Sequence, residues 1–198
     1  MKELARDDAP ERMSLSDFLA WEEAQTLRHE RVGGSVWAMT GGTLAHNRIG
    51  LNVFSAFRTR LAGSGCEAFA FDVRVVSPGG DVMYPDVVVA CGERRDTDKE
   101  VGDPVLVVEV LSDKHGCERW AYGTIPSLKH YVLIAPDRAE AEVATVEGEA
   151  WRSVVLRDVA ASLPLDALGL EIPMAELLAG VDITGDSQVN RSRWADVG

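Results

Sequence analysis

The sequence predicts an α/β (or α+β) domain in which helices flank a mixed central β-sheet. Two apolar runs support the sheet: Tyr84–Ala90 (YPDVVVA) and Pro104–Ser112 (PVLVVEVLS). Their Val and Leu content is typical of strands that are covered on both faces. The patterns follow the order helix, strand, helix, strands, helix, strand and then a β-rich C-terminal part. This order places helices against the sheet.

Length, charge and hydropathy limit the class of protein. The 198 residues and a hydrophobic fraction of 46% are enough for one domain with a real core. The net charge of −12 counts against broad binding to nucleic acid, although it leaves room for a local basic patch. The chain has no run of about 20 apolar residues, and its first residues are too charged for a secretory signal. We therefore expect no membrane segment and a cytoplasmic location.

The cysteines form an odd, scattered set: Cys66, Cys91 and Cys117. They contain no C-x-x-C spacing, so we expect neither a disulfide framework nor a structural zinc site. A reducing cytoplasm is the simplest compartment for such a chain.

The N-terminal half alternates helical and strand patterns. Residues 1–12 are polar and predicted to be flexible, and the folded domain is predicted at 13–181. Ser14 and Asp17 resemble a capping box that begins a helix ending near Arg28. A strand is expected at 30–39, with a turn or bulge at Gly33 and Gly34. Thr43 is then expected to cap a helix to about residue 62, with a buried stripe at Ile49, Val53, Phe57 and Leu61.

The remaining elements are shorter. A strand is expected over 66–76, followed by the two apolar runs, a helix at 118–122 and a buried strand at 131–135. A hairpin around Gly148 is predicted to join 140–146 with 150–157. A short helix is expected at 173–178, and the tail at 182–198 is predicted to be mobile.

The two apolar runs each contain one acidic residue, Asp86 and Glu109. If the loop between the runs is symmetric, antiparallel pairing places residue 86 opposite residue 109, with side chains about 5 Å apart. Two carboxylates at that distance repel by about 3 to 4 kcal/mol at an effective dielectric constant near 20. A bound Mg²⁺ would remove this repulsion, because hard cations prefer oxygen ligands. The alternative is a pair of solvated acids at the ends of two strands.

Several further segments strengthen this interpretation. The pieces, in chain order, are MSLSDFLAWEEA, HERVGGSVWAMTGGTLAHNRI, YPDVVVACG, PVLVVEVLS and IPSLKHYVLIAP. In their order and spacing they resemble the Uma-two family, a group of proposed restriction endonucleases in the PD-(D/E)XK nuclease superfamily. The resemblance covers residues from about 13 to 160.

The resemblance implies a restriction-endonuclease-like fold and a metal-dependent enzyme that hydrolyses DNA phosphodiester bonds with Mg²⁺ or Mn²⁺. Asp86 and Glu109 match the family's metal-binding acids, and the backbone carbonyl of Val110 would be a further ligand. Nucleases of this fold often act as homodimers, because cutting two strands needs two sites.

The resemblance also points to accessory residues. Glu30 and Asp72 match acids near the family's site, and His46 begins the second helix in the family's Ala-His-Asn segment. For all three, an ordinary role at the surface or at the end of an element is the alternative.

The catalytic lysine is where the sequence departs from the family. The usual position, two residues after Glu109, holds Leu111, and the lysine position on the following helix holds Glu118. Lys114 and Arg119 are the nearby cations that remain, and Arg is a poor proton acceptor. Two hypotheses therefore follow: a metal-dependent DNA endonuclease, or a catalytically impaired nuclease-fold protein that binds nucleic acid or a protein partner.

Overall fold

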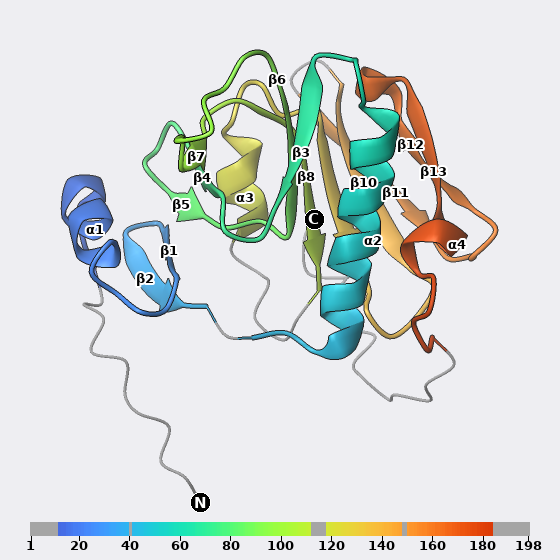
Figure 1. Cartoon of the computed structure of the whole chain (residues 1–198), viewed down its shortest axis with the longest axis horizontal. Helices are drawn as coiled ribbons and strands as arrows, with labels where there is room; N and C mark the ends of the chain where they lie inside the picture. Colours follow the sequence, from blue (N-terminus) through green and yellow to red (C-terminus); the bar gives the residue numbers. More distant parts are fainter. Residues whose placement is uncertain (1–11, 40, 112–117, 148–149, 184–198) are drawn as a thin grey trace, which may run out of the picture.

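A six-stranded sheet forms the centre of the molecule (Figure 1). The computed structural model describes residues 12–39, 41–111, 118–147 and 150–183. The strand order is β11-β10-β9-β8-β6-β3. The strands are β3 (Cys66–Ala70), β6 (Val87–Cys91), β8 (Pro104–Val110), β9 (His130–Ile134), β10 (Ala141–Glu147) and β11 (Ala150–Leu156). Strands β8 and β9 run parallel and the other neighbours antiparallel, so the predicted mixed sheet is confirmed.

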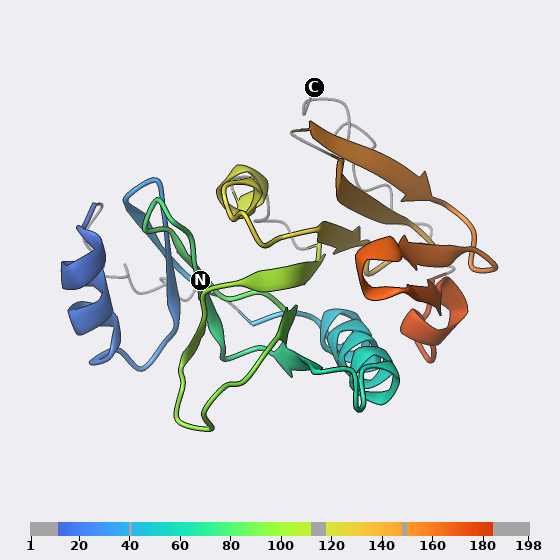
Figure 2. The same ribbon diagram turned by 90° about the horizontal axis from the view of Figure 1, so that it is seen from above.

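Helices cover both faces of this sheet, as Figure 2 shows from above. Helix α2 (Leu44–Arg60) packs its apolar side on one face. The predicted stripe of Ile49, Val53, Phe57 and Leu61 is buried there against Val108 and Val110. Helix α3 (Glu118–Gly123) packs on the other face, where Tyr122 joins a second core cluster with Val107. Burying both faces explains why the central strands are almost entirely apolar.

A second sheet and an N-terminal helix lie at one end of the molecule (Figure 1). The strand order is β2-β1-β5-β4-β7. Its members are β1 (His29–Val32), β2 (Ser35–Ala38), β4 (Arg74–Val76), β5 (Val82–Met83) and β7 (Glu100–Val101). Helix α1 (Leu15–Glu22) begins at Ser14, whose side chain accepts a hydrogen bond from the backbone of Asp17, as predicted. The helix ends earlier than Arg28 because the chain turns back to form β1.

The strand expected over 66–76 is wrong as one element. Phe71 has a φ of 67°, a left-handed conformation that interrupts the strand. Its backbone N–H donates to the carbonyl of Asp86 at 3.2 Å. The chain therefore leaves the central sheet after β3 and enters the second sheet at β4. The apolar pattern could not predict this change of sheet, because the segments before and after Phe71 both have the pattern of a strand.

The C-terminal part completes the central sheet with β10 and β11 and packs its last elements against α2. Strands β10 and β11 form the predicted hairpin, and β12 (Ser162–Leu165) pairs with β13 (Leu170–Pro173). The short helix α4 (Met174–Leu177) lies within the helix predicted at 173–178. The segments predicted to be flexible, 1–12 and 182–198, fall almost entirely outside the described residues.

The cysteine prediction is wrong at one pair. Cys66 on β3 and Cys91 on β6 are directly opposite each other and form a disulfide. An odd number of scattered cysteines does not reveal which two strands lie side by side, so the count alone could not find this pair. Cys117 lies outside the described residues. Within the described residues, no helix is long and apolar enough to cross a membrane.

Candidate active site

The predicted register of the two acidic strands is confirmed. Strands β6 and β8 pair Val87 with Val108, Val88 with Val107 and Val89 with Leu106. Continued by one residue, this register places Asp86 opposite Glu109. The backbone N–H of Asp86 lies 3.4 Å from Oε2 of Glu109. The two acids therefore meet at one end of the strand pair.

Both carboxylates are held in place by hydrogen bonds. The backbone N–H of Val110 donates to Oδ2 of Asp86 at 2.7 Å. Glu109 is only 2% exposed, and its Oε1 accepts a hydrogen bond from the hydroxyl of Tyr122 at 2.9 Å. A buried carboxylate needs such donors, because losing water without replacement is costly.

Tyr122 is a site residue that the motif analysis missed. It lies on α3, is fully buried and packs its ring against Tyr131, with ring centroids 5.3 Å apart. A buried Tyr hydroxyl usually finds a polar partner, and here that partner is Glu109. The sequence does show a tyrosine on a short helix after the strand that carries Glu109. The contact between Tyr122 and Glu109, however, depends on how α3 packs on the sheet.

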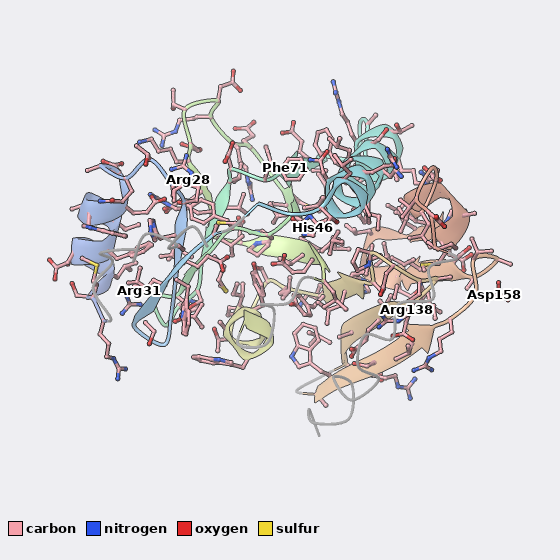
Figure 3. All side chains as sticks on the ribbon, turned by 90° about the horizontal axis from the view of Figure 1, so that it is seen from below. Arg28, Arg31, His46, Phe71, Arg138 and Asp158 are labelled. Atoms are coloured by element: carbon pink, nitrogen blue, oxygen red, sulfur yellow. A yellow bond between two sulfur atoms is a disulfide. The ribbon has the colours of Figure 1, made fainter. Side chains whose placement is uncertain are left out.

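His46 is brought to the same place by the second helix (Figure 3). Thr43 caps α2 by accepting from the backbone N–H of His46 at 3.2 Å. The ring Nε2 then lies 3.2 Å from Oδ2 of Asp86. The hydrogen bond to Asp86 raises the pKa of His46, burial partly opposes it, and the Val110 carbonyl adds a smaller increase. His46 therefore contacts two of the three groups expected to bind metal.

Glu30 reaches the chain just before Asp86. Its Oε1 accepts a hydrogen bond from the backbone N–H of Tyr84 at 2.8 Å. Tyr84 is itself buried, and burial, together with nearby Glu22, raises its pKa to about 12. Arg28 lies over the Tyr84 ring, 5.6 Å from its centroid. These contacts position the Tyr84–Asp86 segment, so Glu30 supports the site from the second sheet.

Asp72 occupies a different environment. Its side chain is 84% exposed, and its Oδ1 lies 3.9 Å from Nε of Arg28. The break at Phe71 turns this part of the chain away from the central sheet. The structure therefore does not bring Asp72 into hydrogen-bonding contact with Asp86 or Glu109.

The expected cations are described only in part. Lys114 lies outside the described residues, and Arg119 belongs to α3 but its side chain is not described. Leu111, at the usual lysine position, is half-buried at the end of β8.

The ligand set is chemically suited to a hard divalent cation. Two carboxylates and a backbone carbonyl, from Asp86, Glu109 and Val110, offer only oxygen atoms, which Mg²⁺ and Mn²⁺ prefer. Among the described residues, however, no group of three or more His, Cys, Asp or Glu side chains is arranged to hold a metal. A cation here would depend on two side chains, the carbonyl and water.

The fold of this chain is shared with a solved structure. A solved structure with a TM-score of 0.68 covers 84% of this chain and 97% of its own, at 17% identity. It is "a putative nuclease belonging to DUF820" from Anabaena variabilis. This chain therefore shares the fold of that structure.

Sequence comparison then gives the family. The profile of the Uma2 family, described as "Putative restriction endonuclease", matches residues 15–175. The chain belongs to the Uma2 family. It is also 28% identical over 178 residues to the uncharacterized protein slr1290 of Synechocystis sp., covering 86% of this chain and 93% of that protein. A second Synechocystis relative, the uncharacterized protein sll1609, is 30% identical over 133 residues, covering 62% of this chain and 74% of that protein.

Proposed function

We propose that this chain is a divalent-metal-dependent endonuclease that hydrolyses DNA phosphodiester bonds. The observation that carries the proposal is the meeting of Asp86 and Glu109 at one end of two central antiparallel strands. Membership of the Uma2 family supports it. Asp86, Glu109 and the Val110 carbonyl would hold Mg²⁺ or Mn²⁺. The metal would lower the pKa of a bound water and stabilise charge on the scissile phosphate.

The chain's own residues prepare this site. The Val110 N–H orients the Asp86 carboxylate, and the Tyr122 hydroxyl orients Glu109. Preorganised groups avoid a reorganisation cost during the reaction. His46 lies beside Asp86 at the start of α2. In a protonated state it would place positive charge close to a bound phosphate.

The test is plasmid cleavage with Mg²⁺ or Mn²⁺. We expect cleavage by the unaltered chain and its loss in Asp86→Ala and Glu109→Gln. Asp158→Asn is the matched control, because Asp158 lies at the edge of the molecule, away from His46 near its centre (Figure 3), and accepts a hydrogen bond from the backbone of Ala160 in a local turn. Equal rates in Asp86→Ala and the unaltered protein would refute the proposal.

A second candidate is a nuclease fold without turnover that binds nucleic acid or a protein partner. One observation favours it: His46 already contacts the Asp86 carboxylate and the Val110 carbonyl, so it satisfies these groups without a metal. Calorimetric titration with Mn²⁺ separates the two. Binding that disappears in Asp86→Asn supports the metal site, and cleavage in the same preparation decides between the two functions.

We also propose a homodimer, because cutting both strands of a duplex needs two sites. Sedimentation at micromolar concentration tests it directly. A monomer that nevertheless linearises plasmid would contradict this part of the proposal.

A further inference from the structure

A cavity of about 420 Å³ lies outside the acidic pair, because neither Asp86 nor Glu109 contributes to its wall. Its wall contains Arg12, Arg31, Gly34, Trp120 and Thr124, together with Gly33 and Asp81. Its volume is within the range of small-molecule sites, about 300 to 1,000 Å³. Its chemistry differs from that of the carboxylate site, because cations and an aromatic ring replace the acids.

Two guanidinium groups converge on this cavity. A Cβ atom at Gly34 would lie 3.6 Å from Nε and Nη2 of Arg12 and 3.8 Å from Nη2 of Arg31. Gly34 has a φ of 84°, so a glycine suits both the turn and this close approach. Figure 3 shows Arg31 on the side of the molecule that carries α1, β1 and β2.

The two arginines are held by neutral groups rather than by acids. Arg12 donates to the carbonyl of Gly33 at 2.9 Å. Arg31 donates to the carbonyls of Met13 and Gly80, at 2.8 and 2.7 Å. Within the described part of the chain, neither arginine forms an ion pair with a carboxylate. Because a guanidinium has five N–H donors, each retains donors for an anion.

The one acidic residue in the cavity wall, Asp81, is held by hydrogen bonds within the protein. Asp81 is buried, and its Oδ1 accepts from the backbone N–H of Gly33 at 2.8 Å. Its Oδ2 accepts from the hydroxyl of Ser77 at 3.1 Å. Both carboxylate oxygens are therefore occupied by the turn that they stabilise.

Trp120 supplies an aromatic surface at the same cavity. Its side chain is on α3 and is 55% exposed, which is unusual for a large aromatic residue. Its ring lies over the β1–β2 turn, because Cζ2 would be 3.9 Å from a Cβ at Gly33. An exposed ring next to paired guanidinium groups matches the two needs of a nucleotide, stacking for the base and hydrogen bonds for the phosphate.

Two elements that line the cavity, α3 and β1, also carry residues that support the carboxylate pair at one end of β6 and β8. Helix α3 carries both Trp120 and Tyr122, the residue that binds Glu109. Strand β1 carries Glu30 and ends at Val32, which is in the same core cluster as Tyr122. The cavity and the carboxylate pair are therefore linked through α3 and β1.

A second exposed tryptophan lies on the site-facing side of the β1–β2 hairpin. Trp37 is directly opposite Glu30 in the antiparallel pair, and opposite residues share a face. Val32 shares that face by alternation and packs with Tyr122. Trp37 is 59% exposed on this face and does not line the cavity.

From this arrangement we propose that the cavity binds an unpaired nucleotide of the substrate strand, with its phosphate on Arg12 and Arg31 and its base on Trp120. The assignment rests on the proposed nuclease function and names its substrate class: single-stranded nucleic acid, or the unpaired end of a duplex. One local basic and aromatic site also agrees with the net charge of −12, which counts against a broad duplex-binding surface.

The test measures binding separately from cleavage. Full-length protein carrying Asp86→Asn is titrated, in EDTA, into labelled dT12 and into a labelled 12-base-pair duplex, and fluorescence anisotropy is recorded. We expect dT12 to bind more tightly than the duplex. Trp120→Ala should weaken dT12 binding by about fivefold or more, the effect of one lost stacking contact, whereas Trp120→Phe should largely restore it.

A charge variant tests the phosphate contact. Arg12→Gln should make the plot of log K against log salt less steep by about 0.7, as for one phosphate contact on a single strand. Arg152→Gln is the matched control, because Arg152 is exposed on β11 and should leave binding and slope unchanged. Far-UV circular dichroism and melting temperature confirm that each variant is folded.

The possible failures are distinguishable. No binding of dT12, or unchanged binding in Trp120→Ala and Arg12→Gln, overturns the nucleotide site even if the unaltered protein cleaves DNA. Free dTMP binding as tightly as dT12 overturns the assignment to a substrate strand. Binding that depends on Trp120 without any metal-dependent cleavage overturns the nuclease proposal and leaves the nucleotide site standing.

Discussion

The hydrogen bond between Tyr122 and Glu109 gives a prediction that can be worked from the structure. Tyr122→Phe removes the hydroxyl that donates to Oε1 of Glu109 at 2.9 Å. The ring itself is unchanged, so its burial and its packing on Tyr131 are kept and no cavity forms. The variant therefore removes the hydrogen bond to the buried carboxylate while keeping the ring in place.

The expected cost follows from the kind of bond. Hydrogen bonds to charged groups contribute about 1.5 to 3 kcal/mol to stability. This bond is longer than the roughly 2.5 to 2.7 Å of the strongest hydroxyl–carboxylate bonds, so the lower part of that range, about 1.5 to 2 kcal/mol, applies. For a protein with a urea m-value of about 2 to 3 kcal/mol/M, the unfolding midpoint should fall by about 0.5 to 1 M.

A double-mutant cycle separates this bond from other effects. Urea unfolding at pH 7.5 is measured for Tyr122→Phe, Glu109→Gln and the double variant. If the hydroxyl acts through the Glu109 charge, the coupling energy between the two positions should exceed about 1 kcal/mol. A coupling energy near zero would refute the reasoning, because Tyr122 would then stabilise the fold independently of Glu109.

Three further predictions test other parts of the fold. Gly42→Ala should move His46 away from Asp86, since a Cβ at residue 42 would lie 2.8 Å from Nδ1 of His46. NMR titration should then show the pKa of His46 falling toward its ordinary value. An unchanged pKa would argue against the contact between His46 and Asp86. Reduction of the Cys66–Cys91 disulfide, which spans 25 residues, should lower the free energy of unfolding by about 3.5 kcal/mol if loop-closure entropy dominates. Equal urea midpoints with and without reductant would contradict this prediction. Cys117→Ser in oxidising buffer is the control. Burial lowers the pKa of His130, whose Nε2 accepts from the backbone N–H of Ala167 at 3.1 Å, so the native state favours the neutral ring. Stability should therefore fall as the pH drops below about 6.5, where the unfolded chain takes up the proton first, and His130→Gln should show a smaller loss between pH 7.5 and 5.5; parallel losses in both proteins would exclude His130 as the cause.

The acidic pair could be predicted from the sequence because the physics that creates it is local. Asp86 and Glu109 lie in apolar runs that are joined by one polar loop, so hairpin pairing sets their register without knowledge of the rest of the fold. The burial of β8 on both faces follows from its composition for the same reason.

The tertiary structure decided what surrounds that pair. Tyr122 and His46 reach the acids only because α3 and α2 pack near the ends of the same strands. The break at Phe71, which separates Asp72 from the acids, follows from a change of sheet that strand propensity cannot show.

Contacts between segments that are distant in the sequence could not be predicted from the sequence, and the reason is the same in each case. Cys66 meets Cys91 because β3 is the edge neighbour of β6, and Arg12 meets Arg31 because the N-terminal segment returns to the β1–β2 turn. Such contacts depend on how sheets and helices are placed against each other, which is governed by the packing of the whole core rather than by any local pattern. The sequence alone thus determined the strands and the acids on them. Only the tertiary structure determined which side chains contact those acids.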